Sequence, residues 1–379
     1  MSNFYCAAPW RSLHINPRGD VKTCCAGNPN MLGNLNTSSI EEVLNGAILK
    51  EIRQTIAQGQ AHAYCSNCVM AESQGGNSER SWHNNLNPDI DYTTAGDKFQ
   101  YSVLIDVRWN TTCNMSCNYC DPSASSVWAG LKGIPVKSGT RPYYEQVCDF
   151  IAKHHDHIKE VALIGGEPLL LPENNRLLEV VPEDALITLI TNLNVDLESN
   201  KIFQKLKTRP RVGWSMSFDN IGDRFEYVRS GGNWELLKRN LETIQNLMSA
   251  QGHHGGIHAV YNVYNATRLC ELREFANERG LSIVWQTLFW PNYLNPFLHG
   301  TKFAELAVQE INRLYESNLA TASDRQFFDQ ALATYCTGSN KNAESIQQAF
   351  YNHIHQIEHD YHPASIGKFA KLWPELLAV

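Results

Sequence analysis

The sequence has no hydrophobic run long enough to cross a membrane. A transmembrane helix needs about 20 consecutive apolar residues, and none of the 379 residues belongs to such a run. The first ten residues, MSNFYCAAPW, lack the basic region and apolar segment that are typical of a secretory signal. We therefore expect a cytoplasmic protein with no membrane partner.

The sequence also lacks an excess of positive charge. It has 32 Lys and Arg residues against 39 Asp and Glu residues, which gives a net charge of −7. Nucleic-acid-binding surfaces are usually basic, so no nucleic-acid partner is evident. The composition, 43% hydrophobic and 19% charged, is ordinary for a globular chain.

Cysteine, in contrast, is abundant. A disulfide framework would suit a small secreted domain, whereas clustered cysteines in a large chain without an export signal more often bind metal. Eight of the eleven cysteines lie before residue 121, so we expect the metal chemistry in the first third of the chain. The eleven are Cys6, Cys24, Cys25, Cys65, Cys68, Cys113, Cys117, Cys120, Cys148, Cys270 and Cys336.

The pattern of residues divides the chain into four parts. Residues 1–75 form a cysteine-bearing module, in which a capping-box sequence around Ser39 should begin a helix that extends to Ile56. Residues 76–98 are rich in Asn, Ser, Gly and Asp, which is typical of a linker. Residues 99–295 alternate between apolar runs and helical patterns, and residues 296–379 form a helical C-terminal segment.

The alternating part predicts an α/β fold with a parallel sheet and crossover helices. Six strand–helix units predict a partial (β/α)6 barrel that resembles an incomplete TIM barrel, in which the reactive groups belong at the carboxyl ends of the strands. The expected strands are Ser102–Val107, Glu160–Ile164, Leu186–Thr191, Gly213–Phe218, Ile257–Asn262 and Ser282–Thr287, and the expected helices include Tyr143–His155, Asn233–Ser249 and Thr267–Gly280.

Three cysteines follow the first barrel strand on one short loop: Cys113, Cys117 and Cys120. Three thiolates can hold three irons of a cubane cluster and leave the fourth iron open to a ligand. A zinc site would need a fourth Cys or His nearby, and the next eight residues, 121–128, contain neither. The spacing therefore favours a catalytic iron–sulfur cluster.

This CxxxCxxC motif, with Tyr119 before its last cysteine, resembles that of the radical S-adenosylmethionine superfamily. The resemblance implies that Cys113, Cys117 and Cys120 bind a [4Fe–4S] cluster whose open iron binds S-adenosylmethionine. It also implies an external one-electron reductant of the flavodoxin or ferredoxin type, cofactor cleavage to a 5′-deoxyadenosyl radical, and an adenine contact by the backbone of Tyr119.

Further segments match the superfamily at the ends of later strands. Gly165, Gly166 and Glu167 stand where the family binds the methionine ammonium group, although a Gly-Gly pair alone is usually only a turn. The residues that the resemblance assigns to cofactor binding beyond this motif are Asn192, Ser215, Ser217, Asp219 and Arg229. Instead of contacting the cofactor, the strand hydroxyls could form local hydrogen bonds within the fold, and Arg229 could be a solvated charge at a helix end.

The N-terminal cysteines resemble the opening of the SPASM auxiliary-cluster module, in its abbreviated form called twitch. Cys6, Gly19 and Cys24 have the spacing of that module, and Cys65 and Cys68 complete four ligands for an auxiliary [4Fe–4S] cluster. Here the module precedes the barrel, whereas it usually follows it. Cys25 could replace Cys24, and a four-cysteine zinc site would have a similar pattern.

The resemblance identifies the cofactor chemistry better than the substrate. Many relatives with such modules oxidise, cross-link or epimerise ribosomal peptides, and we expect this class of reaction. The alternatives are oxidation or rearrangement of a small molecule (a sugar, nucleotide or amino-acid derivative) and a non-enzymatic electron carrier or scaffold. The roles of Cys336 and of the C-terminal segment stay open, as does the oligomeric state.

Overall fold

The structure is a computed structural model, and it describes residues 4–28, 32–73, 78–100, 103–136, 141–288, 290–336 and 342–377. The chain divides into two compact units. The first comprises Met1–Thr111, Lys137–Leu189 and Glu198–Gly213. The second comprises Thr112–Val136, Ile190–Leu197 and Trp214–Val379.

Six strands alternate with helices, which confirms the predicted partial (β/α)6 barrel. The pairs β4–β5, β5–β6 and β8–β9 are parallel, and all five residues of β4 are buried, as expected of a strand covered on both faces. The strands are β4 (Val103–Val107), β5 (Ile158–Leu163), β6 (Leu186–Thr191), β7 (Val212–Ser217), β8 (His254–Tyr261) and β9 (Ser282–Thr287). Ser102, predicted to begin the first strand, lies outside the described residues.

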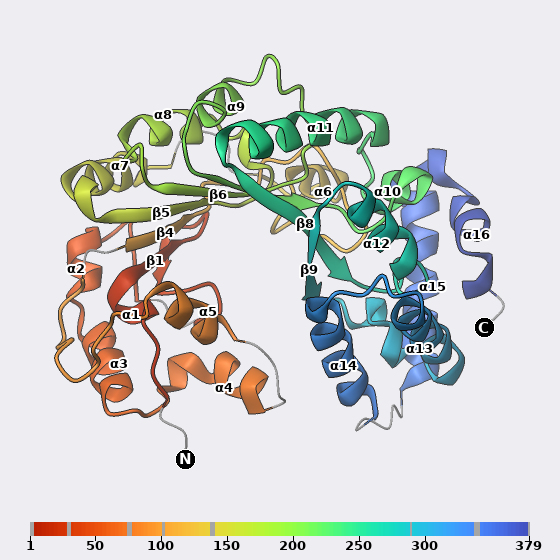
Figure 1. Ribbon diagram of the computed structural model, residues 1–379, viewed down its shortest axis with the longest axis horizontal. Helices are drawn as coiled ribbons and strands as arrows, with labels where there is room; N and C mark the ends of the chain where they lie inside the picture. Colours follow the sequence, from red (N-terminus) through yellow and green to blue (C-terminus); the bar gives the residue numbers. More distant parts are fainter. Residues whose placement is uncertain are drawn as a thin grey trace. The chain divides into compact units, whose positions relative to one another are not determined.

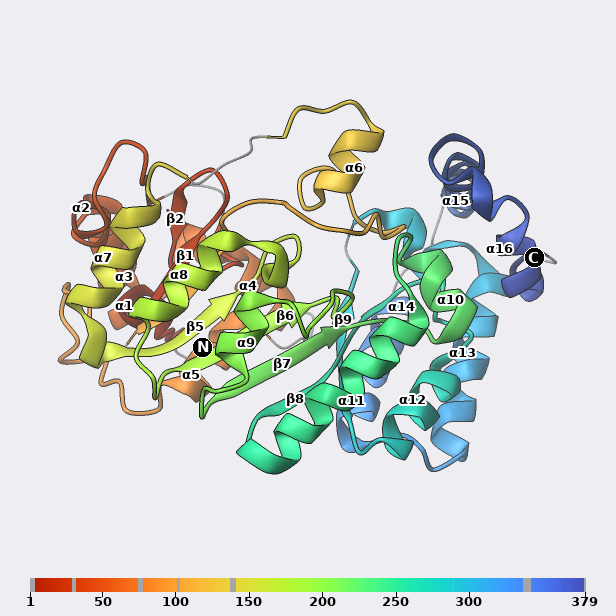
Figure 2. The ribbon, with the colours of Figure 1, turned by 90° about the horizontal axis from the view of Figure 1, so that it is seen from above.

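Helices connect these strands. In the first unit, α7, α8 and α9 lie over one face of the sheet (Figures 1 and 2). In the second unit, α11 runs alongside β8. The helices are α6 (Ser126–Leu131), α7 (Tyr144–Lys153), α8 (Pro172–Val180), α9 (Lys201–Leu206), α10 (Gly222–Val228), α11 (Trp234–Gln251) and α12 (Leu269–Glu278).

The N-terminal module adds three strands to the edge of the sheet in the first unit. Strand β1 (Ser12–Ile15) pairs in parallel with β4, and β2 (Asp20–Lys22) and β3 (Gly33–Asn34) follow in antiparallel order. The module's helices are α1 (Ala8–Arg11), α2 (Ile40–Leu44), α3 (Ala47–Ala57) and α4 (Ser66–Ser73). Ser39 and Glu42 form the capping box that begins α2, but the single predicted helix is two helices, since Gly46 is the N-cap of α3.

Part of the predicted linker is folded. Helix α5 (Glu79–Leu86) lies within residues 76–98, and Asp89 forms an ion pair of 2.6 Å with Arg11. The indole Nε1 of Trp10 donates to the carbonyl of Gly96 at 2.9 Å. Polar side chains and backbone carbonyls of this segment thus form an ion pair and a hydrogen bond with the N-terminal module.

The C-terminal segment is helical, as predicted. It contains α13 (Thr301–Glu316), α14 (Ala322–Cys336), α15 (Ala343–His355), α16 (Lys368–Leu372) and a π-helical turn, Gln356–Tyr361. Its buried Phe350, Phe369 and Trp373 pack in one cluster with Trp128 and Tyr264 of the second unit. No helix in the described residues is both long and apolar enough to span a membrane.

Candidate functional site: two cysteine sites

The loop after β4 carries the three predicted ligands and is held in place by backbone and hydroxyl hydrogen bonds. The hydroxyl of Ser126 accepts from the amide of Cys113 at 3.1 Å. The indole of Trp128 donates to the carbonyl of Cys117 at 2.9 Å, and the amide of Cys120 donates to the same carbonyl at 2.9 Å. The start of α6 thus positions the loop.

The other side of this loop is tied to the segment around Arg229. The amide of Asn118 donates to the carbonyl of Val228 at 2.7 Å, and the amide of Ser116 donates to the carbonyl of Ser230 at 2.9 Å. Gly231 has a φ of +95°, and a Cβ there would lie 2.9 Å from the carbonyl oxygen of Asn114. Only glycine permits this close approach without strain.

An ion-paired network lies beside the thiols. Arg229 is 5% exposed, and its Nε donates to Oδ2 of Asp219 at 3.0 Å. The hydroxyl of Tyr119 donates to the same oxygen at 2.8 Å, and the amide of Val260 donates to Oδ1 at 2.7 Å. The guanidinium lies 5.5 Å from the centre of the Tyr119 ring, and its Nη1 lies 4.0 Å from Sγ of Cys117.

The electrostatics of these thiols suit a cationic metal group. Burial raises the pKa of Cys120 to about 12, and burial also raises the pKa of Cys117, against the effect of Arg229. The neighbouring cysteines add to both shifts, because thiolates that lie close together repel one another. A bound iron group would remove this penalty, since coordinated thiols are deprotonated.

Several predicted cofactor residues lie around the same loop. Asn192, just after β6, donates to the side-chain oxygen of Asn114 at 2.8 Å and lies 3.9 Å from Sγ of Cys113. Ser215 and Ser217 lie on the same face of β7. Ser215 is half-buried, and Ser217 is 9% exposed.

The Gly165-Gly166-Glu167 turn follows β5 and belongs to the first unit. Gly165 has a φ of +140°, and a Cβ there would lie 3.1 Å from the carbonyl oxygen of Asn110, which explains the glycine. Glu167 is fully buried, and Oε1 accepts from the amide of Leu169 at 3.0 Å. The carboxylate therefore has a fixed orientation at the end of a barrel strand.

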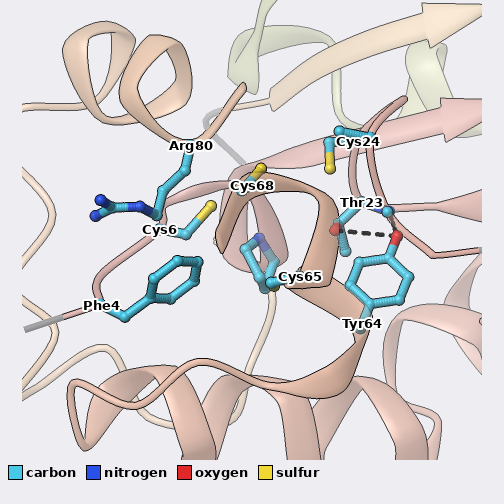
Figure 3. Close-up of a pocket in the computed structure, with 11 residues that line it drawn as sticks. Phe4, Cys6, Thr23, Cys24, Tyr64, Cys65, Cys68 and Arg80 are labelled. Atoms are coloured by element: carbon cyan, nitrogen blue, oxygen red, sulfur yellow. Dashed lines mark hydrogen bonds between the residues drawn. The ribbon is translucent and has the colours of Figure 1, made fainter. Parts of the chain in front are cut away.

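The four predicted auxiliary ligands line one pocket of the first unit (Figure 3). Cys6 precedes α1, and Cys24 follows β2. Cys65 ends the short 3-10 helix Ala63–Cys65, and Cys68 lies in the first turn of α4. Phe4, Tyr64 and Arg80 are among the other side chains that line this pocket. Cys25 is not among the residues that line it, and its thiol hydrogen-bonds to Glu79 instead.

Burial and mutual repulsion also govern these thiols. Burial, with a smaller contribution from the nearby cysteines, raises the pKa of Cys6 and of Cys65 to about 12. Four buried thiols in one pocket fit the donor set of an iron–sulfur cluster. Among the described residues, no three His, Cys, Asp or Glu side chains lie close enough together to hold a single metal ion.

Tyr64 shapes this pocket and was not singled out by the sequence. Its hydroxyl accepts from the amide of Thr23 at 3.0 Å and so holds the chain that leads to Cys24 (Figure 3). A Cβ at Gly27 would lie 2.2 Å from the same hydroxyl. A single tyrosine before Cys65 belongs to no recognisable sequence motif, so its role is seen only in the folded structure.

His258 is a second residue that the sequence did not indicate. It lies on β8, where burial lowers its pKa and where Asp219 and Arg229 act on it electrostatically. A histidine on an alternating strand is not distinctive in the sequence. The side chain of Cys336 lies outside the described residues.

Comparison with known proteins agrees with both cysteine sites. Residues 107–276 match the radical SAM superfamily, and residues 6–69 match the SPASM iron–sulfur cluster-binding domain. GTP 3′,8-cyclase of Nautilia profundicola is 26% identical over 192 residues, which cover 49% of this chain and 57% of that protein. 7-Carboxy-7-deazaguanine synthase of Clostridium acetobutylicum is 28% identical over 129 residues, or 34% of this chain and 52% of that protein. The chain thus spans only about half of the length of these relatives.

Two solved structures are similar to this chain at low identity. SuiB of Streptococcus suis bound to S-adenosylmethionine has a TM-score of 0.44 and 12% identity, and the match covers 81% of this chain and 69% of SuiB. Native anSMEcpe with bound AdoMet has a TM-score of 0.41 and 18% identity, and covers 56% of this chain and 59% of that chain.

The two domain matches fall on the two cysteine sites that the fold assembles. They imply three cofactors: a [4Fe–4S] cluster, S-adenosylmethionine and an auxiliary cluster. Residues 107–276 thus form a radical S-adenosylmethionine superfamily domain, and residues 6–69 form an SPASM iron–sulfur cluster-binding domain.

Proposed function

We propose that this enzyme cleaves S-adenosylmethionine reductively and abstracts a hydrogen atom from a carbon of a peptide substrate. The observation that carries the proposal is the three-thiol loop, Cys113, Cys117 and Cys120, with Arg229 held 4.0 Å from Sγ of Cys117. When bound, the cluster and S-adenosylmethionine supply a 5′-deoxyadenosyl radical. The electron would come from an external reductant of the flavodoxin or ferredoxin type.

The residues of this chain would bind and orient the cofactor. Cys113, Cys117 and Cys120 would hold the cluster, and Glu167 would accept hydrogen bonds from the methionine ammonium group. The two glycines, Gly165 and Gly166, would let the backbone approach the cofactor. The remaining proposed contacts are made by the backbone of Tyr119 and by Asn192, Ser215, Ser217 and Arg229.

Asp219 has a different task in this proposal. Both of its carboxylate oxygens accept hydrogen bonds from protein groups. We therefore assign it the positioning of Tyr119 and Arg229, whereas the strand hydroxyls of Ser215 and Ser217 would contact the ribose.

The auxiliary site would hold a second, fully ligated cluster through Cys6, Cys24, Cys65 and Cys68. Four thiolates leave no iron free for a substrate, so this cluster suits electron transfer. Cys24 is preferred over Cys25 because only Cys24 lines the pocket.

Cofactor cleavage tests the first part of the proposal. The anaerobically reconstituted, reduced protein should convert S-adenosylmethionine to 5′-deoxyadenosine and methionine, which chromatography quantifies. Cys117→Ala should abolish this release, whereas Cys270→Ala, at a buried cysteine of α12, should retain it. Cleavage by a folded Cys117→Ala variant, or a wild-type protein that binds only zinc, would contradict the proposal.

Action on a small molecule is the second candidate. It is favoured by the sequence similarity to proteins named GTP 3′,8-cyclase and 7-carboxy-7-deazaguanine synthase. Binding measurements on the reconstituted protein with GTP and with synthetic peptides would separate the two classes. Saturable binding of GTP, but of no peptide, would favour the small-molecule reaction.

A further inference from the structure

A second group of buried polar side chains lies in the first unit, apart from the cysteine pocket. Its centre is a pair formed across strands β1 and β4, where His14 is in register with Asp106. Nδ1 of His14 lies 2.8 Å from Oδ2 of Asp106. The two residues are 5% and 9% exposed, so this contact is shielded from water.

Arg108 completes this pair at the carboxyl end of β4. Its Nε donates to Oδ1 of Asp106 at 3.2 Å, and its Nη2 donates to Oδ2 at 3.0 Å. Although burial opposes ionisation, His14 and Arg108 together lower the pKa of Asp106. Asp106 is therefore ionised and its charge is balanced by the guanidinium.

Helix α5 lies on the opposite side of the sheet from α7 and α8 (Figure 1). Glu79 of α5 accepts a hydrogen bond from the thiol of Cys25 and interacts electrostatically with Asp106 and Arg108. His83, one turn further on, is 2% exposed, and its Nδ1 has no partner within the described residues.

These features do not suit a purely structural role. Burying ionisable groups is costly, and apolar residues of similar size would often stabilise such a position as well or better. The ring nitrogens of this group are not all used within it: Nδ1 of His83 has no partner in the described residues, and His14 uses Nδ1, not Nε2, for its hydrogen bond to Asp106. Clusters of titratable side chains at the carboxyl ends of barrel strands are typical of functional sites.

We propose that His14, oriented by Asp106, is the proton acceptor for an uncharged O–H or N–H group of the substrate. Because Asp106 donates no proton, it fixes the imidazole with its hydrogen on Nδ1 and leaves the lone pair of Nε2 free. The ligand is uncharged because Asp106 and Arg108 already neutralise each other. This proposal rests on the proposed function, since the group that is deprotonated belongs to the substrate of that reaction.

The proton transfer balances within the site. The substrate O–H or N–H bond breaks, its electron pair stays on the oxygen or nitrogen, and the proton forms a bond to Nε2. The resulting imidazolium is stabilised by Asp106 at 2.8 Å. Cys25 of this group directly follows Cys24 of the auxiliary pocket, so the proton acceptor and the auxiliary thiols belong to the same compact unit.

Carbethoxylation of histidine tests whether Nε2 is an accessible, activated acceptor. The reconstituted holoprotein is treated with diethyl pyrocarbonate under anaerobic conditions, and labelling is followed by mass spectrometry of tryptic peptides. His14 lies in residues 12–18, between Arg11 and Gly19, and so gives a peptide with a single histidine. We expect His14 to be labelled in the folded protein, whereas His83, which is more deeply buried and whose Nδ1 is closed to solvent, should stay unlabelled.

A matched pair of variants tests the role of Asp106. Asp106→Asn should slow the labelling of His14 several-fold, because the ring loses the partner that orients it. The control is Asp156→Asn, since His155 and Asp156 form an exposed pair at 3.4 Å, and labelling of His155 should hardly change. Equal effects of the two substitutions would overturn the role of Asp106.

Protection by small probes tests the class of ligand. N-acetylserinamide, which has an uncharged hydroxyl, should slow the labelling of His14 more than N-acetylalaninamide or inorganic phosphate. Stronger protection by phosphate, equal protection by all three, or a His14 that reacts only after unfolding would reject the proposal. If His14 fails these tests but the same preparation releases 5′-deoxyadenosine, only the role of His14 is rejected and the proposed function stands. If the probe protects His14 but no 5′-deoxyadenosine is released, only the proposed function is rejected.

Discussion

Single residues beside the three-thiol loop are held by several partners at once. Asp219 is 1% exposed and accepts hydrogen bonds from Tyr119, Arg229 and the amide of Val260. Removing one member of a buried ion pair leaves the other charged and unpaired, which typically costs about 3–5 kcal/mol. The stability of this region therefore depends on a few charges.

Asp219→Asn should lower the free energy of unfolding by about 3 kcal/mol, because Arg229 would stay buried without its counter-charge. Denaturant unfolding of the apoprotein measures the change. The matched control is Asp223→Asn, at an exposed position of α10, which should change stability little. If both variants unfold alike, the ion pair does not stabilise the fold.

Glu167→Gln should weaken binding of S-adenosylmethionine by about 1.5–3 kcal/mol, the usual value for a hydrogen bond to a charged group. Glutamine keeps an oxygen that can accept from the amide of Leu169, so the local turn should survive. Equilibrium dialysis with the reconstituted protein measures the affinity. Glu179→Gln, at an exposed carboxylate of α8, is the control, and an unchanged affinity in Glu167→Gln would remove Glu167 from the cofactor site.

At the scale of elements, the auxiliary pocket depends on how closely two segments approach. The turn that contains Gly27 lies against the short 3-10 helix Ala63–Cys65, and the amide of Asn28 donates to the carbonyl of Tyr64 at 2.9 Å. Any side chain at residue 27 would overlap the ring of Tyr64.

Gly27→Ala should therefore displace Tyr64 and reduce the iron held by the auxiliary site, while the three-thiol loop keeps its iron. Iron analysis after reconstitution measures the loss. Gly130→Ala is the control, because a Cβ at Gly130, in α6, meets nothing within 4 Å. Full iron content in Gly27→Ala would show that the pocket tolerates the displacement.

At the scale of the whole molecule, the two cysteine sites should divide the work. We expect about eight irons per chain in the wild-type protein, as two cubane clusters. The double variant Cys65→Ala, Cys68→Ala should keep about four irons and still release 5′-deoxyadenosine, but it should lose net oxidation of the substrate. Product formed in full yield by a folded double variant would leave the auxiliary cluster a structural role only.

Buried and half-buried histidines in the two units should make the apoprotein sensitive to mild acid. Burial lowers the pKa of His83, His299 and His353 to about 4. Because the unfolded chain binds these protons from about pH 6.5 downward, stability should fall between pH 6.5 and 4 and be highest above that window. Thermal unfolding at a series of pH values measures this, and a melting temperature that is constant from pH 7 to 4.5 would contradict it.

The sequence alone determined the barrel strands and the two groups of cysteines, and it indicated the superfamily. These are local signals: alternating apolar runs, a capping box and cysteine spacings are read within a few residues. The predicted bounds of β6 and β9 agree with the structure to the residue for this reason.

Only the tertiary structure decided which distant residues meet. The parallel pairing of β1 with β4 joins His14 to Asp106 across 92 positions of sequence, and nothing in either segment specifies that partner. The same holds for α5, where a composition typical of a linker forms a helix, and for the auxiliary pocket, which Cys24 lines and the adjacent Cys25 does not. Non-local pairing depends on the packing of the whole sheet, and no local period encodes it.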